Sequence, residues 1–239
     1  MTTWLGDRTG VVTGASRGIG AGIAAALAAK GVRVVMIARN EARLKEAAKG
    51  LKGSIPIVCD VSDPNSVEKA TRQIEKELGA APDILVNNAG IFGVSVVEET
   101  KTSFFVDTIN TNLVAPFLFI RAFLADMKKR KSGHIVTIGS IADRTIFTGN
   151  AAYSGAKFGL RAVHEVLRAE LRGSGVRASL ISPASTDTEI WNSVTVTDPV
   201  GKPHSTRPML SPDDVAAAVM FALTQPERVN IDELRLSHS

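Results

Sequence analysis

Tyr153 is the only tyrosine in the chain, and Lys157 follows it four positions later. On a helix, this spacing places both side chains on one face, with Cβ atoms about 5–6 Å apart. An unperturbed phenol has a pKa of about 10, so it needs a nearby positive charge to exchange protons at neutral pH. The Lys157 ammonium group acts in that direction. The pair therefore predicts a proton donor and acceptor for an alcohol or a carbonyl.

Ser140 closely follows the β-branched run Ile135–Ile138, which predicts a buried strand. Ligands of open parallel sheets bind at the carboxyl ends of the strands, so Ser140 falls where a site is expected. Its hydroxyl could donate to the same substrate oxygen as Tyr153 and stabilise developing negative charge. Taken alone, Tyr-x-x-x-Lys is a weak motif, and Ser140 could equally be a turn residue at a strand end.

A glycine-rich turn lies between a predicted strand ending at Thr13 and a predicted helix. Its spacing is T-G-x-x-x-G-x-G. Such glycines let the backbone turn sharply and approach a pyrophosphate, which the N–H groups of the following helix then bind. The alternative is a tight turn without a ligand. The cofactor contacts predicted here are Gly14, Ser16, Arg17, Gly18, Ile19 and Gly20.

The end of the second predicted strand, Val32–Ala38, favours NADP(H) over NAD(H). A carboxylate at this point would bind the adenosine ribose of NAD, but the chain continues with Arg39 and has no acid there. The guanidinium groups of Arg39 and Arg17 suit a 2′-phosphate, although either could be an ordinary surface residue. After the third strand, Asp60 and Val61 are expected near the adenine. Asp60 could equally cap a turn.

Apolar runs alternate with helical stretches along the whole chain, which predicts parallel βαβ units. The predicted strands are Val11–Thr13, Val32–Ala38, Ile55–Val58, Ile84–Val86, Ile135–Ile138, Val176–Ile181 and a possible last strand, Ile231–Leu236. The predicted helices are Ile19–Lys30, Glu41–Lys49, Pro64–Leu78, Lys101–Lys131, Ala151–Arg172 and Pro212–Leu223. We expect an α/β, Rossmann-like, doubly wound parallel sheet of about seven strands with helices on both faces.

The length of 239 residues suits a single domain that binds a dinucleotide and carries the catalytic groups. A segment at about 185–210 has little periodicity. Because it follows the sixth strand, it is expected to close over the site as a substrate loop, although a plain surface excursion is the alternative.

The composition excludes several kinds of site. Cys59 is the only cysteine, so neither an intrachain disulfide nor a cysteine-based metal cluster can form. No metal site is expected, because the four histidines are scattered: His134, His164, His204 and His238. The net charge of +4 is mild and spread out, and we expect no nucleic-acid partner. Without a signal peptide or an apolar run of about 18 residues, a cytoplasmic protein with no membrane partner is expected.

Together these motifs resemble those of the short-chain dehydrogenase/reductase family in its single-domain form. The resemblance runs from Thr9 to about Thr188. The residues that carry it are Thr13–Gly20, Asn87-Asn88-Ala89-Gly90, Asn112, Ser140 and Tyr153-Ser154-Gly155-Ala156-Lys157. In this order and spacing they are highly specific.

The resemblance implies a catalytic role for each of four residues. Tyr153 would be the general acid in reduction and the base in oxidation. Lys157 would lower the pKa of Tyr153, aided by an oxidised nicotinamide, and hold the nicotinamide ribose hydroxyls. Ser140 would orient the substrate oxygen. Asn112 would hold a water that links Lys157 to solvent for proton relay.

The resemblance also extends the predicted cofactor site. Asn88, Ala89 and Gly90 would shape the cofactor crevice, and Pro183 and Thr188 would lie near the nicotinamide. One departure concerns the turn after the sixth strand, where the family often has Pro-Gly and this chain has Pro183-Ala184. The C-terminal tail also differs from the usual glycine pair, and it faintly resembles relatives that oxidise 3-hydroxy amino acids or reduce assorted carbonyls.

The predicted function is an NADPH-dependent carbonyl reductase or alcohol dehydrogenase, similar to 3-oxoacyl reductases. The alternatives are a non-catalytic NADP(H)-binding scaffold or redox sensor, and a 3-hydroxy acid or amino acid dehydrogenase. Apolar walls suggest a medium-sized ketone as the substrate, and these walls are Phe92, Gly93, Val94, Ile141–Phe147 and Trp191. A carboxylate or phosphopantetheine could instead bind Arg144, Lys202 or Arg207. Pairing of the long helices near Lys101–Lys131 and Ala151–Arg172 would give a homodimer or homotetramer.

Overall fold

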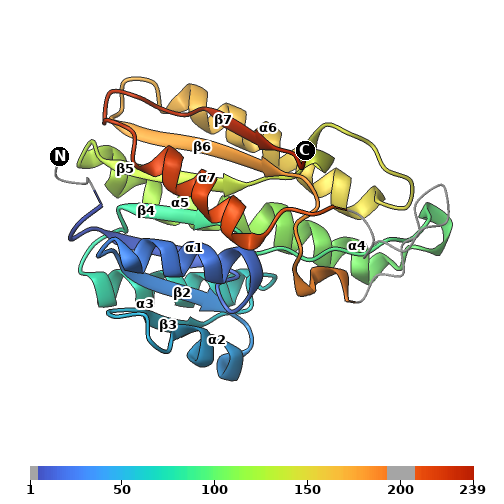
Figure 1. Ribbon diagram of the computed structural model, residues 1–239, viewed down its shortest axis with the longest axis horizontal. Helices are drawn as coiled ribbons and strands as arrows, with labels where there is room; N and C mark the ends of the chain where they lie inside the picture. Colours follow the sequence, from blue (N-terminus) through green and yellow to red (C-terminus); the bar gives the residue numbers. More distant parts are fainter. Residues whose placement is uncertain (1–4, 193–207) are drawn as a thin grey trace.

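A seven-stranded sheet in the order β3-β2-β1-β4-β5-β6-β7 organises the computed structural model, which describes residues 5–192 and 208–239 (Figure 1). All neighbouring strands are parallel. The strands are β1 (Thr9–Thr13), β2 (Arg33–Ala38), β3 (Ile55–Val58), β4 (Ile84–Asn87), β5 (Gly133–Ile138), β6 (Val176–Pro183) and β7 (Glu233–Leu236). The sequence prediction of the sheet is confirmed, with the last strand beginning two residues later than expected.

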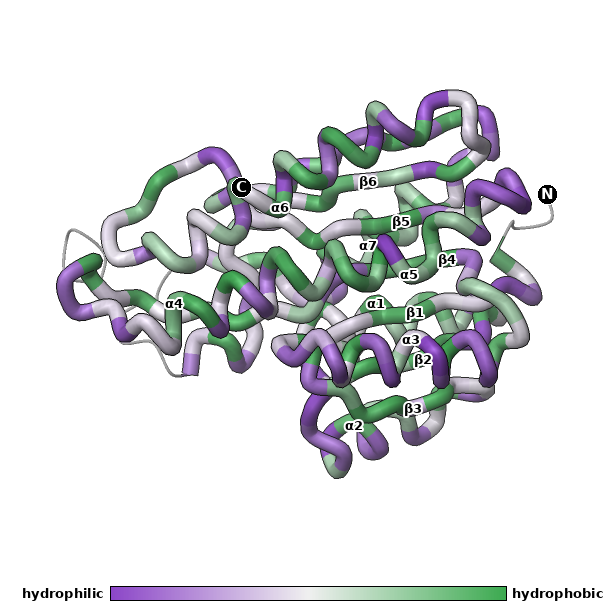
Figure 2. The backbone as a smooth tube through the Cα atoms, turned by 180° about the vertical axis from the view of Figure 1, so that it is seen from behind, coloured by the Kyte–Doolittle hydropathy of each residue, from purple (hydrophilic) through white to green (hydrophobic). Residues whose placement is uncertain are grey.

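Helices cover both faces of this sheet. They are α1 (Gly18–Ala29), α2 (Glu41–Ala48), α3 (Pro64–Leu78), α4 (Thr102–Ile109), α5 (Ala115–Lys129), α6 (Ala151–Glu170) and α7 (Pro212–Leu223). One buried apolar cluster joins α1, α2 and α7 to the sheet through side chains such as Leu27 and Val219. The other joins α3, α5 and α6 through Ile74 and Phe119. Figure 1 shows α1 and α7 in front of the sheet, and Figure 2 shows the molecule from behind.

Side-chain caps explain where several helices begin. The Asn40 carboxamide accepts a hydrogen bond from the Arg43 N–H at 2.9 Å, which fixes the start of α2 immediately after β2. Asp63 caps α3 in the same way. Pro64 is the first residue of α3, where an N–H has no acceptor within the helix, so the N–H that proline lacks is not missed. Each cap turns the chain sharply at the carboxyl edge of the sheet, where the site residues lie.

The single helix predicted over Lys101–Lys131 is interrupted. A π-helical turn, Asn110–Val114, separates α4 from α5. Pro116 lies in the first turn of α5 and has no N–H to donate to the carbonyl of Asn112, four residues earlier, so the regular α-helical ladder cannot continue through this point. Such turns are frequent at functional sites.

Within the described residues, the helical stretch Thr102–Lys129 is long and apolar enough to cross a membrane by length and composition alone. A core helix passes the same test, and Phe119 and Phe123 of this stretch are completely buried in the protein. The absence of a membrane partner stays a prediction.

Two histidines are buried in the neutral form beside hydroxyl groups. Nε2 of His134, on β5, lies 2.8 Å from Oγ of Ser179, and Nδ1 of His164, on α6, lies 3.1 Å from Oγ1 of Thr137. Burial lowers the pKa of His134 to about 3 and that of His164 to about 4. The folded protein therefore takes up these protons at lower pH than the unfolded chain does.

We expect the free energy of unfolding to fall as the pH drops below about 6.5, because the unfolded state then binds protons that the folded state excludes. Each histidine contributes roughly 2 kcal/mol of this loss between about pH 7 and pH 5. Urea unfolding at both pH values measures it. The His134→Gln variant should lose about half of the pH dependence, and an unchanged dependence would contradict the assignment.

Candidate active site

A cavity of about 1320 Å³ opens at the carboxyl edge of the sheet. It includes the glycine turn after β1 and the residues that follow β4. β1 and β4 are neighbours in the sheet, and the order of the strands reverses between them. This is the place where doubly wound sheets bind their ligands. The volume exceeds the roughly 300–1,000 Å³ typical of a drug-sized ligand, so it can hold a dinucleotide together with a small substrate.

The glycine turn packs so closely that it excludes side chains. Gly14 has a φ of 67°, and a Cβ atom built on it would lie 2.8 Å from the Cα of Ala89. A Cβ on Gly20 would lie 2.3 Å from the carbonyl oxygen of Gly14 and 2.5 Å from Nδ2 of Asn88. Glycine is therefore required at both positions for the turn before α1 to pack against the segment that follows β4.

Thr13 and Asn88 bind the glycine turn to the segment after β4. Oγ1 of Thr13 accepts hydrogen bonds from the N–H groups of Asn88 and Ala89, both at 3.0 Å. Nδ2 of Asn88 donates to the carbonyl of Thr13 at 2.8 Å. The two segments that the sequence assigned to the cofactor are thus one rigid unit.

Asn112 has a structural partner. Its Oδ1 accepts from the N–H of Ile91 and its Nδ2 donates to the carbonyl of Ile91, both at 2.9 Å. The side chain is completely buried and does not line the cavity. The water that the resemblance implies at Asn112 stays a prediction, and Pro116 deprives the main-chain carbonyl of Asn112 of its α-helical donor.

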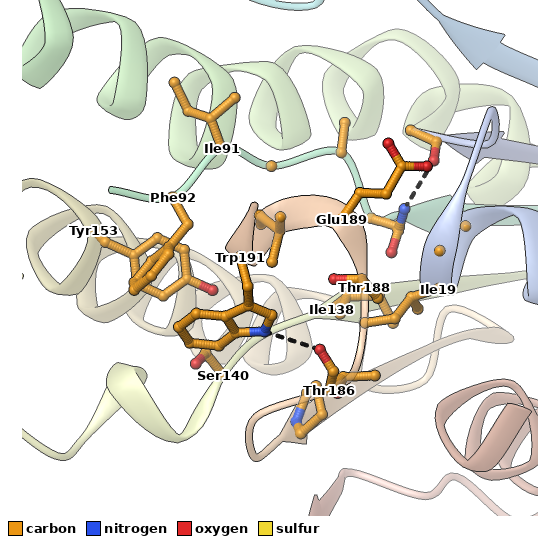
Figure 3. A pocket seen from close by; sticks show the side chains of 18 of the residues that line it. Ile19, Ile91, Phe92, Ile138, Ser140, Tyr153, Thr186, Thr188, Glu189 and Trp191 are labelled. Carbon is orange, nitrogen blue, oxygen red and sulfur yellow. Dashed lines mark hydrogen bonds between the residues drawn. The ribbon is translucent and has the colours of Figure 1, made fainter. Parts of the chain in front are cut away.

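The Ser140 hydroxyl is oriented by its own backbone. Its Oγ accepts a hydrogen bond from the N–H of Ala142 at 3.1 Å, which occupies one lone pair and leaves the hydroxyl hydrogen to donate. Figure 3 shows the hydroxyl of Tyr153 directed toward Ser140 across the cavity. A hydrogen bond between these two side chains acts to lower the pKa of the phenol. Ser140 is therefore placed to donate to an oxygen that Tyr153 also reaches.

Tyr153 and Lys157 lie together on α6, as the spacing predicted. The Lys157 ammonium lies 5.7 Å from the centre of the Tyr153 ring and donates to the carbonyl of Ile138 at 2.8 Å. Burial lowers the pKa of Lys157 to about 8. Burial also raises the pKa of Tyr153 to about 12, and the negative charge of Asp143 acts in the same direction. Burial is thus the largest effect on the phenol pKa in this structure, and the lowering by Lys157 and an oxidised nicotinamide stays a prediction.

Aromatic side chains form the wall opposite the sheet. The Phe92 ring packs edge-on against Tyr153 with centroids 4.9 Å apart, and against Trp191 at 4.8 Å. Nε1 of Trp191 donates to the carbonyl of Thr186 at 2.9 Å, which fixes the indole in the cavity (Figure 3). Val94, Ile141 and Phe147 also line the cavity, as predicted, whereas Gly93 does not.

Arg144 is not available to bind a substrate carboxylate. Its Nε donates to Asp143 at 2.7 Å, and its other end lies 2.5 Å from the carboxylate of Glu233 on β7. It does not line the cavity, so this part of the sequence prediction is wrong. Lys202 and Arg207, the other cations considered, lie outside the described residues.

Three arginines line the opposite end of the cavity. The guanidinium groups of Arg17 and Arg43 converge on one carboxylate, Glu189, at 2.7 and 2.9 Å. Arg39 lies 3.7 Å from Asp60 and is largely exposed. Arg43 was not predicted at the site from the sequence. Its position in the first turn of α2, directly after the Asn40 cap and the end of β2, could have indicated that it lies near the cofactor.

Asp60 caps a turn and also lines the cavity. Its Oδ1 accepts hydrogen bonds from the backbone N–H and the hydroxyl of Ser62, at 3.0 and 2.7 Å. These hydrogen bonds and the nearby Arg39 together hold its pKa below the usual range, although burial opposes them. The sequence left two roles open for Asp60, a contact with the adenine and a turn cap. The structure shows the cap, and the contact with the adenine stays a prediction.

The remaining predicted cofactor residues lie around the same cavity. They are Ser16, Gly18, Ile19, Val61, Gly90, Pro183 and Thr188. Ser140, Tyr153 and Lys157, which the sequence predicted to be catalytic, line it as well. The cavity therefore brings together residues that are spread over most of the sequence.

Known proteins resemble this chain over nearly its full length. The model of the short chain dehydrogenase family matches residues 8–198. An uncharacterised oxidoreductase of Staphylococcus saprophyticus is 37% identical over 234 residues, which cover 96% of this chain and 97% of that protein.

Solved structures agree with this match. A metagenomic short-chain oxidoreductase in complex with NADP has a TM-score of 0.82 and 31% identity, and the match covers 98% of this chain and 99% of that one. An alcohol dehydrogenase of the archaeon Thermococcus sibiricus, complexed with 5-hydroxy-NADP, has a TM-score of 0.83 and 29% identity over 96% of this chain and 95% of its own. Sequence, fold and site geometry agree, and the chain belongs to the short-chain dehydrogenase family of oxidoreductases.

Proposed function

We propose that this protein interconverts a carbonyl and a secondary alcohol, with NADP(H) as the hydride carrier. One observation carries the proposal: Ser140, Tyr153 and Lys157 lie at one end of a cavity whose other end presents Arg17 and Arg43. The first group provides proton transfer at a substrate oxygen, and the second provides paired guanidinium groups for a phosphate.

The residues present fit such a cofactor. The glycine turn, which leaves no room for a Cβ at Gly14 or Gly20, suits a pyrophosphate at the N-terminus of α1. Arg17 and Arg43 already converge on a carboxylate, Glu189, so an anion is accommodated between them. Both solved relatives named above are complexes with NADP or a derivative, which supports the choice of cofactor.

A bound nicotinamide would supply the hydride donor or acceptor. In reduction, the Tyr153 hydroxyl gives its proton to the substrate oxygen while the Ser140 hydroxyl donates a hydrogen bond to that oxygen. The pKa of about 12 keeps Tyr153 protonated at neutral pH, as an acid must be before the substrate arrives. The Lys157 ammonium, 5.7 Å from the ring, stabilises the phenolate that remains.

The alternatives explain less of the site. A non-catalytic scaffold or redox sensor has no need for Ser140, Tyr153 and Lys157 around one cavity. A 3-hydroxy acid or amino acid dehydrogenase needs a cation for the substrate carboxylate, and Arg144, the one such candidate within the described residues, is already paired with Asp143 and Glu233. The aromatic wall favours a medium-sized apolar ketone instead.

A panel of carbonyls tests the function. Apolar ketones, diketones, 3-oxoacyl thioesters, 3-oxo acids and sugars are each supplied with NADPH or NADH, and oxidation of the cofactor is followed by its absorbance. We expect turnover with NADPH, and the highest kcat/KM with an apolar ketone. A protein that binds NADPH but turns over no carbonyl, and no alcohol in the reverse direction, would instead be a scaffold.

The arginines predict the cofactor preference. Replacing Arg17 or Arg43 by alanine should weaken NADPH binding by about 10- to 100-fold and leave NADH binding nearly unchanged, because each removes a charge-assisted bond to the 2′-phosphate. Arg39→Ala should have a smaller effect, because that side chain is 78% exposed and lies near Asp60. Calorimetric titration with both cofactors measures these affinities.

The matched control is Arg33→Ala. Arg33 is an exposed arginine at the start of β2, away from the cavity, and its replacement should change neither affinity. Equal losses for NADPH and NADH in the Arg17 and Arg43 variants would contradict a 2′-phosphate site.

A homodimer or homotetramer is also proposed. Exposed apolar side chains on α4, α5 and α6 provide a surface for it, namely Phe105, Val106, Phe117, Phe158 and Val166. Sedimentation equilibrium that gives the monomer mass at micromolar concentration would exclude the assembly.

A further inference from the structure

Asp143 is a completely buried carboxylate next to Ser140, and the mechanism above does not use it. Its Oδ1 accepts from Nε of Arg144 at 2.7 Å. Its Oδ2 accepts from the hydroxyl of Ser182 at 2.6 Å and from the N–H of Ser140 at 3.4 Å. Every one of these groups is a donor, so both oxygens of the carboxylate act as acceptors.

The carboxylate lies directly against the strand end that carries Ser140. A Cβ atom on Gly139 would lie 2.7 Å from Oδ2 of Asp143 and 2.7 Å from Oγ of Ser182. Asp143 and Ser140 also form a reciprocal cap, because Oγ of Ser140 accepts from the N–H of Ala142 while Asp143 accepts from the N–H of Ser140. The conformation of Ser140 therefore depends on this carboxylate.

The charge of Asp143 is only partly compensated. Arg144 pairs with Asp143 and also with Glu233, so one guanidinium serves two carboxylates and the cluster retains one negative charge. This charge disfavours a phenolate at Tyr153 and favours an ammonium at Lys157, so it raises the pKa of both groups.

We propose that Asp143 is a positioning residue: its buried carboxylate fixes the backbone of Ser140 and keeps the proton on the Tyr153 hydroxyl until a substrate oxygen receives it. This inference rests on the proposed function, because it assigns Tyr153 the role of an acid. The charged and titratable groups that act on Tyr153 are Asp143, from the loop after β5, and Lys157, on its own helix. Those that act on Asp143 are Arg144, Tyr153 and Lys157, with Glu233 of β7 acting through Arg144.

The single tyrosine makes the proposal directly measurable. The ultraviolet absorbance of tyrosinate reports the ionisation of Tyr153 without any turnover. In the cofactor-free Asp143→Asn variant, which is nearly isosteric, we expect the midpoint of this titration to move to lower pH by about one unit. Circular dichroism at each pH distinguishes ionisation of the folded protein from unfolding.

A second readout is kinetic. The basic limb of the kcat profile for carbonyl reduction should move to lower pH in the same variant, and kcat should fall about tenfold because Ser140 loses its anchor. The KM for NADPH should not change, because the arginines that favour NADPH lie at the other end of the cavity. A loss of stability alone would not move the pH profile.

Two further variants complete the test. Glu233→Gln removes a charge from the far side of Arg144 and should move the midpoint by less than Asp143→Asn does. If Asp143→Asn folds poorly because Arg144 loses its partner, the triple variant Asp143→Asn/Arg144→Gln/Glu233→Gln removes all three charges, and with them the net negative charge, and should still move the midpoint down.

If the Asp143→Asn protein and the wild type have the same midpoint in the tyrosinate titration and the same pH profile of kcat, the proposal is overturned. Because the titration needs no substrate, it can support or overturn the role of Asp143 even if the panel of carbonyls shows no turnover. Failure of the proposed function is therefore distinguishable from failure of this inference.

Discussion

The Tyr153→Phe protein should lose about 1,000-fold in kcat for carbonyl reduction while binding NADPH with nearly wild-type affinity. The substitution removes only the hydroxyl that transfers the proton, and general acid catalysis of this kind contributes about 10²–10⁴-fold. The phenyl ring keeps its edge-on contact with Phe92, so the wall of the cavity remains intact. Steady-state kinetics and calorimetric titration with NADPH measure the two quantities separately.

Ser154→Ala is the matched control for this loss. Ser154 is the next residue on α6, and its buried hydroxyl has no hydrogen-bond partner among the described residues. It does not line the cavity, so removing it should change kcat by less than about twofold. A Tyr153→Phe protein that kept more than a tenth of the wild-type rate would disprove the assignment of the acid.

Gly20→Ala should both destabilise the fold and disrupt cofactor binding. The new Cβ would lie 2.3 Å from the backbone carbonyl oxygen of Gly14 and 2.5 Å from Nδ2 of Asn88, which a hydrogen bond to the carbonyl of Thr13 holds in place. Overpacking of this kind costs about 1–3 kcal/mol of unfolding free energy. Because the displaced turn is the one assigned to the pyrophosphate, NADPH affinity should fall at least about tenfold.

Gly22→Ala, two residues further along α1, is the matched control. It introduces the same methyl group into the same helix without a steric conflict. Its nearest neighbours would be 3.6 Å away, an ordinary contact, so it should gain about 0.5–1 kcal/mol of helix stability and leave NADPH affinity unchanged. Chemical unfolding and calorimetric titration of both variants test this contrast. Wild-type affinity in Gly20→Ala would show that the turn does not hold the cofactor.

Local patterns predicted most of the fold. The run Val32–Ala38 is apolar except at Arg33, and β2 is buried from Val34 to Ala38, because both faces of a parallel sheet are covered. The spacing of Tyr153 and Lys157 placed the pair correctly, since neighbours four apart share a helix face. The π-turn before Pro116 was missed, because helical periodicity alone does not register a single widened turn.

The long-range charge pairs could not be predicted in the same way. Arg17 and Glu189 lie 172 positions apart, and nothing in the spacing of either one identifies the other. Arg144 was one of three cations considered for a substrate carboxylate, but it is paired with its neighbour Asp143 and with Glu233. Glu233 lies on β7, which the pairing with β6 brings near. The pKa of Tyr153 likewise depends on burial, which is a property of the folded chain.

The ion pairs of Glu189 have a consequence for ligand binding. A phosphate that enters between Arg17 and Arg43 must first replace the carboxylate of Glu189. The binding free energy gained is therefore smaller than that of a contact with two unpaired guanidinium groups. The displaced carboxylate belongs to the short segment Glu189–Trp191, whose indole forms part of the substrate wall. If release of Glu189 displaces this segment, binding of the cofactor phosphate and binding of a substrate against Trp191 would each alter the affinity for the other by the same factor.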